Sequence, residues 1–145
     1  MQLALDEARR AALAGEVPVA AVVTDGTGAV LAVAGNQVEA GQNPVFHAEF
    51  LALSIARAGR AQKYLTDCTL TVTLEPCAFC AGAIAAFRVG RLVFGAYDPK
   101  TGAVEHGPRL FSHATTHHKP EVVGGVREQE SAALLKEFFE AKRDA

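Results

Sequence analysis

This 145-residue chain has no tryptophan, a single methionine and only 3 cysteines. Three thiols cannot all pair, so a disulfide framework is not the source of stability. No apolar run is long enough to cross a bilayer, and the first residues lack the charged-then-apolar order of a signal peptide. We therefore expect a cytoplasmic protein with no membrane partner.

An excess of positive charge is also missing. The chain carries 14 Lys and Arg against 16 Asp and Glu, a formal net charge of −2, which differs from the strongly basic character of many nucleic-acid binders. The charge is unevenly placed, because residues 88–145 hold 9 basic and 8 acidic side chains while residues 1–87 hold 5 and 8. Any contact with nucleic acid should use the C-terminal part.

Hydrophobic periodicity predicts one α/β domain over residues 1–145. Expected helices cover 2–14, 47–58, 77–87 and 128–142, and expected strands cover 18–23, 29–34, 70–74, 91–96 and 121–126. Residues 97–120 are irregular with a short helix. Strands alternating with helices indicate crossovers, so we expect a three-layer α/β/α fold whose mixed five-stranded sheet has helices on both faces.

Apolar residues at helical spacing predict which faces of the two terminal helices point inward. In the first helix these are Leu3, Leu5, Ala8, Ala12 and Leu13. In the last helix they are Ala132, Leu135, Phe138 and Phe139, although two adjacent phenylalanines cannot both be fully inward.

The most specific motif is His47-Ala48-Glu49, followed by Pro76-Cys77 and Cys80. It matches the H-x-E…P-C-x-x-C pattern of zinc nucleobase deaminases. One imidazole and two thiolates leave one position of a tetrahedral Zn²⁺ open for water, as in catalytic sites. Zinc lowers the pKa of that water to about 7. The start of a helix, where both cysteines are expected, favours thiolates.

Glu49 is not needed as a metal ligand, so we assign it as the acid/base. It would take a proton from the water and deliver protons to the ring nitrogen and the departing amine. Two other interpretations of the CxxC remain open, a redox pair and a closed structural zinc site. A closed site would take its fourth ligand from Cys68, His106, His113, His117 or His118.

With these residues in place, the chain resembles the bacterial tRNA adenosine deaminases of the cytidine deaminase superfamily. The resemblance runs along almost the whole chain. The zinc motif marks the whole superfamily, whereas two further segments are more particular to the tRNA enzymes. These are Phe94-Gly95-Ala96-Tyr97-Asp98-Pro99-Lys100-Thr101-Gly102 and Leu134-Leu135-Lys136-Glu137-Phe138-Phe139.

The resemblance implies a cytidine deaminase-like fold and a homodimer with one zinc ion per subunit. It implies hydrolytic deamination of adenosine to inosine at the tRNA wobble position (A34), with the anticodon loop of tRNA-Arg (ACG) as the expected partner. His47, Cys77 and Cys80 would bind zinc, and Glu49 would be catalytic. It further implicates Val19, Asn36 and Ala48 at the target nucleoside, Asp98 at a flanking nucleotide, and Phe138, Phe139, Lys142 and Arg143 at the anticodon loop.

The chain departs from the family pattern at a few positions. Val45-Phe46 precedes His47 where the family usually has Thr-Ala, and Phe46 is expected to narrow the pocket or offer a stacking surface. Ala20 replaces a common glycine, and Phe79 a frequent methionine. These changes leave the zinc ligands intact but keep a second substrate class open, a free nucleobase or nucleoside such as guanine or cytosine.

Overall fold

The computed structural model describes residues 1–145 and contains the predicted order of helices and strands. The helices are α1 (Gln2–Leu13), α2 (Ala48–Ala58), α3 (Ala78–Phe87) and α4 (Glu128–Asp144), with a short 3₁₀ helix η1 (Leu110–Ser112). The strands are β1 (Ala20–Thr24), β2 (Val30–Gly35), β3 (Thr69–Leu74), β4 (Arg91–Ala96) and β5 (Glu121–Val123). The largest boundary difference is at β5, which was expected to reach residue 126. It ends early because Gly125 adopts a positive φ of 81° and turns the chain towards α4.

The five strands form one mixed sheet in the order β2-β1-β3-β4-β5. β1 pairs antiparallel with both β2 and β3, and the β3–β4 and β4–β5 pairs are parallel. A tight turn joins β1 to β2, in which the Asp25 carboxylate accepts the N–H groups of Thr27 and Ala29. The predicted mixed sheet is therefore confirmed, with the hairpin at one edge and the crossover strands at the other.

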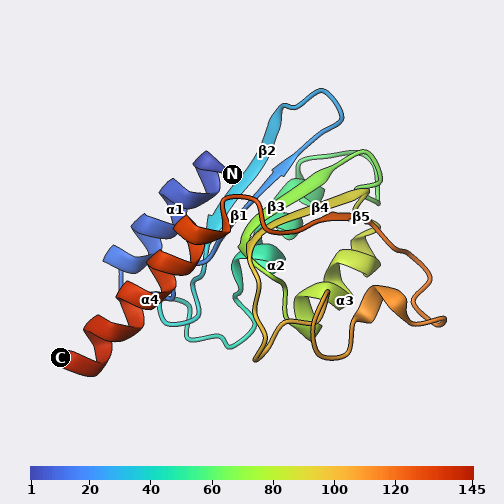
Figure 1. The fold of residues 1–145 in the computed structure, drawn as a ribbon. Helices are drawn as coiled ribbons and strands as arrows, with labels where there is room; N and C mark the ends of the chain where they lie inside the picture. Colours follow the sequence, from blue (N-terminus) through green and yellow to red (C-terminus); the bar gives the residue numbers. More distant parts are fainter.

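Helices cover both faces of the sheet, as Figure 1 shows. α1 and α4 lie side by side on one face, and α2 and α3 lie on the other. The main core lies between the sheet and α2 with α3, and its fully buried side chains include Leu53, Leu70, Ile84 and Phe94. The parallel strands β3 and β4 end at the same edge of this core, which is where a ligand site is expected in such a fold.

The predicted inward faces of the terminal helices were partly wrong. α1 buries Ala4, Leu5, Ala8 and Ala11, whereas Leu13 is 90% exposed. α4 buries Ser131 and packs Leu135 against the core, while Ala132 is exposed and Phe139 is 49% exposed. Phe138 is half-buried, so of the two adjacent phenylalanines one faces the protein and the other faces solvent.

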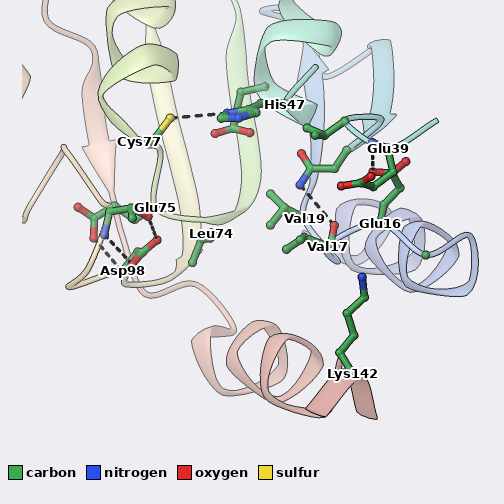
Figure 2. A pocket seen from close by; sticks show the side chains of 15 residues that line it. Glu16, Val17, Val19, Glu39, His47, Leu74, Glu75, Cys77, Asp98 and Lys142 are labelled. Atoms are coloured by element: carbon green, nitrogen blue, oxygen red, sulfur yellow. Dashed lines mark hydrogen bonds between the residues drawn. The ribbon is translucent and has the colours of Figure 1, made fainter. Parts of the chain in front are cut away.

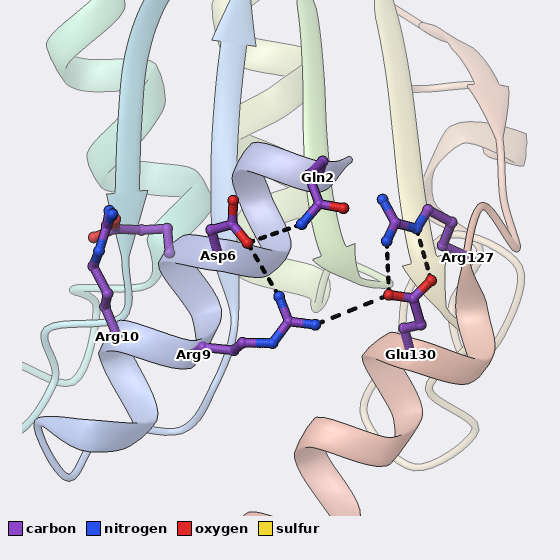
Figure 3. Close-up of polar contacts among 7 residues, drawn as sticks. Gln2, Asp6, Arg9, Arg10, Arg127 and Glu130 are labelled. Carbon is purple, nitrogen blue, oxygen red and sulfur yellow. Dashed lines mark hydrogen bonds and ion pairs between the residues drawn. The ribbon is translucent and has the colours of Figure 1, made fainter.

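Ion pairs connect α4 to α1 (Figure 3). Arg9 contacts Asp6 on its own helix at 3.1 Å and Glu130 of α4 at 3.9 Å. Arg127 holds the same Glu130 with two hydrogen bonds of 2.7 and 2.8 Å. These contacts orient α4, whose C-terminal turn reaches the cavity described below.

Candidate active site

Two helices begin at the same place beside the carboxyl end of β3. His47 is the N-cap residue of α2, and Cys77 is the N-cap residue of α3. Glu49 and Cys80 follow in the first turns of these helices. Because the N-terminus of a helix carries partial positive charge, both junctions favour the anionic forms of thiol and carboxyl groups.

His47, Cys77 and Cys80 form the only group of three or more potential metal ligands in the protein whose donor atoms lie this close together, within 4.8 Å of one another. The His47 Nδ1 atom is 3.6 Å from Cys77 Sγ and 3.4 Å from Cys80 Sγ. Tetrahedral zinc with the usual bond lengths would place sulfur and nitrogen ligands about 3.5–3.6 Å apart. The donor set and its spacing therefore fit a zinc ion.

The protonation of this cluster suits metal binding. A hydrogen bond from the Cys80 thiol, helped by the neighbouring His47 ring, lowers the pKa of Cys77 to about 4. The pKa of Cys80 is raised because it donates to Cys77 and is buried. One thiolate is thus already formed at neutral pH, and a bound cation would favour loss of the second proton.

Glu49 is 4% exposed and lies beside the cluster on α2. Burial raises its pKa, and the negative charge of Cys77 raises it further. A raised pKa makes a carboxyl group a better proton acceptor, which suits an acid/base. Glu49 also lines the cavity described below.

A closed structural site has no fourth ligand here. Cys68 is buried away from the cluster, and its sulfur accepts a hydrogen bond from Arg60 at 2.6 Å. His106 contacts Glu75, and His118 contacts the Val89 carbonyl at 2.6 Å. The arrangement of three ligands with one open position is the one that the structure supports.

A cavity of about 250 Å³ opens beside the cluster (Figure 2). Its metal side is formed by His47, Glu49 and Cys77. The remaining walls are formed by Gly15, Glu16, Val17, Val19, Asn36, Val38, Glu39, Leu74, Glu75, Asp98, Thr101 and Lys142. The predicted residues Val19, Asn36, Asp98 and Lys142 therefore share one cavity with His47 and Cys77, whereas Cys80 and Ala48 are buried and do not line it.

Asn36 connects the end of β2 to the start of α2. Its side-chain oxygen accepts the Ala48 N–H at 2.9 Å, and its amide nitrogen donates to the Val17 carbonyl at 3.4 Å. It supplies a side-chain cap that His47 itself does not make. One amide hydrogen of Asn36 remains free for a ligand, whereas the Ala48 N–H is already used.

The sequence analysis missed Glu75, a buried carboxylate between Asp98 and the cluster. Its two oxygens accept five hydrogen bonds, from the N–H groups of Asp98, Val104, Glu105 and His106 and from the His106 ring. Burial alone would raise the pKa of Glu75, but these hydrogen bonds hold it below its ordinary value. The only sequence signal is an acidic residue at the end of a buried strand, directly before Pro76.

Asp98 is tied mainly to its own loop. Its carboxylate accepts the N–H groups of Lys100 and Thr101 at 3.1 Å and the Thr101 hydroxyl at 2.6 Å. The loop-forming role that an Asp before a proline suggests is therefore present. The same side chain also lines the cavity, as Figure 2 shows.

Glu16 is a second buried carboxylate that the sequence did not reveal. Its oxygens accept the N–H groups of Glu39 and Ala40 at 3.0 and 2.8 Å, which fixes the loop between β2 and α2. Within that loop the Phe46 ring packs against Gly41 and does not line the cavity. The expectation that Phe46 narrows the pocket was therefore wrong.

The predicted tail residues lie on α4. Lys142 reaches the mouth of the cavity, and its Nζ atom lies 5.2 Å from the centre of the Phe138 ring. Phe139 and Arg143 are exposed. Lys142 therefore stands at the edge of the cavity, on the side opposite His47 and Cys77 in Figure 2, with the Phe138 ring close to its Nζ atom.

Residues 1–96 match the family described as the cytidine and deoxycytidylate deaminase zinc-binding region. The chain is 47% identical over 144 residues to a tRNA-specific adenosine deaminase of Agrobacterium fabrum, covering 99% of this chain and 93% of that protein. It is 41% identical over 143 residues to the tRNA-specific adenosine deaminase of Bacillus subtilis, covering 99% and 88%.

Several solved structures of deaminases are similar to this chain. One comes from a study of A-to-I editing by tRNA:A34 deaminases at the wobble position, with a TM-score of 0.90, 46% identity and coverage of 93% of this chain and 97% of that one. Another is the guanine deaminase of Nitrosomonas europaea, with a TM-score of 0.76, 27% identity and coverage of 94% and 81%. The greater likeness is to the tRNA:A34 structure.

Proposed function

The chain belongs to the family of tRNA-specific adenosine deaminases, and we propose that it hydrolyses adenosine to inosine at the wobble position (A34) of a tRNA. The observation that carries this proposal is that the cluster of His47, Cys77 and Cys80 opens through His47 and Cys77 onto a cavity that is also lined by the buried carboxyl group of Glu49. The reaction consumes one water, replaces the C6 amino group with oxygen and releases ammonia.

In this proposal His47, Cys77 and Cys80 hold one zinc ion per subunit. When bound, zinc supplies hydroxide at neutral pH by lowering the pKa of a water at its open position. Glu49 moves the protons. It accepts one from the water and delivers protons to the ring nitrogen and to the departing amine, for which its burial and raised pKa suit it.

Substrate recognition is proposed for three cavity residues, Val19, Asn36 and Asp98, and for Ala48, which is hydrogen-bonded to Asn36. Val19 packs against the base, and the free amide hydrogen of Asn36 bonds the nucleoside. Ala48 contributes through its N–H, which holds Asn36 in place. Asp98 faces the nucleotide flanking the target, and a flipped base is presented from a single-stranded anticodon loop.

The cavity contains several carboxylates, yet it can accept an anionic RNA. The charges of Glu16, Glu75 and Asp98 are each stabilised by at least two backbone N–H donors. Lys142 adds a positive charge at the mouth. We propose that Lys142 and Arg143 contact the anticodon-loop phosphates while Phe138 and Phe139 offer apolar and stacking surface.

We further propose that residues 1–145 act as one deaminase domain, as a homodimer, in the cytoplasm. Phe79 of α3 is partly exposed, and the centre of its ring lies 5.5 Å from that of Phe50. This apolar surface on α3 is available to contact a second copy of the chain. The free thiols suit a reducing compartment. No helix of the structure has the length and apolar character needed to span a membrane.

The test is deamination of a synthetic anticodon stem-loop containing ACG by the zinc-loaded protein. Free adenosine, guanine and cytosine are assayed beside it, and products are identified by mass spectrometry. The expected result is inosine in the loop and little turnover of the free compounds. Turnover of a free base with no inosine in the loop would refute the proposed substrate and favour the nucleobase deaminase alternative.

A further inference from the structure

The geometry points to Glu75 as a positioning residue of the active site, an inference that rests on the proposed function. Glu75 touches neither the cluster nor, in our proposal, the reacting atoms. We infer that its carboxylate holds residues 98–106 as the wall of the cavity that faces the nucleotide flanking the target. Its loss should therefore weaken substrate binding while leaving the zinc ligands in place.

The hydrogen bonds of Glu75 divide between its two oxygens. Oε1 accepts the Asp98 N–H at 3.0 Å and contacts the His106 Nδ1 at 2.8 Å. Oε2 accepts the N–H groups of Val104, Glu105 and His106 at 3.1, 2.9 and 3.1 Å. The Glu75 side chain is 0% exposed, so one buried group gathers donors from both ends of the loop.

The loop so held forms part of the cavity. Asp98 and Thr101 both line it and are bonded to each other, so the position of the Asp98 backbone sets the position of both side chains. The loop also packs directly against the carboxylate, because a Cβ atom on Gly102 would lie 2.6 Å from the Glu75 carboxyl carbon. Moving the carboxylate must therefore move the cavity wall.

Replacing Glu75 with glutamine separates the two ends of the loop. Glutamine has one acceptor oxygen and one NH₂ group. If the oxygen stays with the N–H groups of residues 104–106, the NH₂ group faces the Asp98 N–H and His106. Neutral His106 can change tautomer and accept a hydrogen bond, but the Asp98 N–H cannot. Glu75→Gln thus removes specifically the hydrogen bond that the Asp98 N–H donates to Glu75.

The experiment compares wild type, Glu75→Gln and the exposed control Glu121→Gln, all loaded with zinc. KM and kcat are measured on the ACG stem-loop, with zinc content and unfolding temperature measured in parallel. Loss of a hydrogen bond to a charged group predicts a KM about tenfold higher for Glu75→Gln. The kcat value should stay within about threefold and zinc content should not change. Glu121→Gln should match wild type.

A double-mutant cycle tests the route through the loop. In an Asp98→Ala background the KM effect of Glu75→Gln should fall below about twofold, because the Asp98 carboxylate that the displaced loop carries towards the flanking nucleotide is already absent. An unchanged KM in Glu75→Gln would overturn the inference. Joint loss of zinc and kcat would also overturn it, since Glu75 would then act through Cys77.

Two further arms keep the inference testable. If Glu75→Gln does not fold, His106→Ala removes one of the five donors and should raise KM about two- to threefold, and an unchanged KM would contradict the inference. If wild type forms no inosine in the stem-loop, the proposed function fails by itself. The positioning role is then tested on the loop itself, by amide hydrogen exchange of residues 98–106, and equal exchange in wild type and Glu75→Gln would refute it.

Discussion

Gly102→Ala tests how tightly the buried carboxylate holds the cavity wall. The added Cβ atom would lie 2.6 Å from both the carboxyl carbon and Oε2 of Glu75, and it would also meet the Asp98 carbonyl oxygen. Neither neighbour can move freely. Glu75 accepts five hydrogen bonds, and the Asp98 carbonyl accepts the Gly102 N–H at 2.9 Å.

Forcing one methyl group into such a site typically costs about 1–3 kcal/mol, and losing one hydrogen bond to the carboxylate adds about 1.5–3 kcal/mol. A destabilisation of about 3 kcal/mol should lower the unfolding temperature of a domain of this size by about 6–12 °C. Thermal unfolding followed by circular dichroism at saturating zinc measures it, because bound metal contributes to stability in both proteins.

Gly82→Ala is the matched control with the opposite sign. Gly82 lies inside α3, and its added Cβ would meet only the Leu110 side chain, at 3.9 Å. Alanine is favoured over glycine inside a helix by about 0.5–1 kcal/mol, so this variant should unfold at the wild-type temperature or a few degrees above it. The reasoning fails if Gly102→Ala unfolds at or above the wild-type temperature while Gly82→Ala behaves as expected.

Three further predictions concern the site itself. Glu49→Gln should lower kcat by about 10²–10⁴, because glutamine cannot transfer the protons. It should not lower the unfolding temperature, because burial disfavours the Glu49 carboxylate that it replaces. Thermal unfolding and inosine formation are measured on one preparation, and retained activity would refute the proton role. After zinc removal by a chelator at pH 7, iodoacetamide should modify Cys77 first, because its pKa is about 4. Cys68 and Cys80 should react later, because both are buried and their pKa values are raised, that of Cys68 to about 11. Peptide mass spectrometry that finds Cys68 or Cys80 modified first would contradict the assignment. Lys142→Ala should raise KM for the stem-loop. The slope of log affinity against log salt concentration should become shallower by about one, the value for one lost phosphate contact. An unchanged slope would show that Lys142 does not contact a phosphate.

The order of helices and strands could be predicted from periodicity, but the inward faces of α1 and α4 could not. Both helices approach the sheet at glycines. A Cβ on Gly35 would lie 3.2 Å from the Ala11 side chain, and a Cβ on Gly95 would lie 3.1 Å from the Ser131 Cβ. Close approach selects small side chains, so Ala4, Ala11 and Ser131 are buried although they were not expected to be, while Leu5, Ala8 and Leu135 face inward as expected. The hydrophobic pattern of a helix does not indicate how closely that helix approaches the sheet.

The site divides in a similar way. Two short motifs contain His47, Glu49, Cys77 and Cys80, so the sequence alone could predict that these four residues share one site. Glu75 could not be found by the same reasoning, because its donors come from positions 23 to 31 residues further along the chain. Its role depends on where the chain returns, which spacing within a motif does not encode.

The two halves of the cavity are consequently built in different ways. The proposed zinc ligands and Glu49 stand at the starts of α2 and α3, which are regular helices packed on the sheet. The facing walls are two loops, each pinned by one buried carboxylate, Glu16 for the loop before α2 and Glu75 for the loop after β4. Substitutions in these loops can therefore change which substrate fits while the metal site stays intact. We therefore expect the residues at the starts of α2 and α3 to determine the type of reaction. The two loops should determine whether the cavity accepts an anticodon loop or a free base.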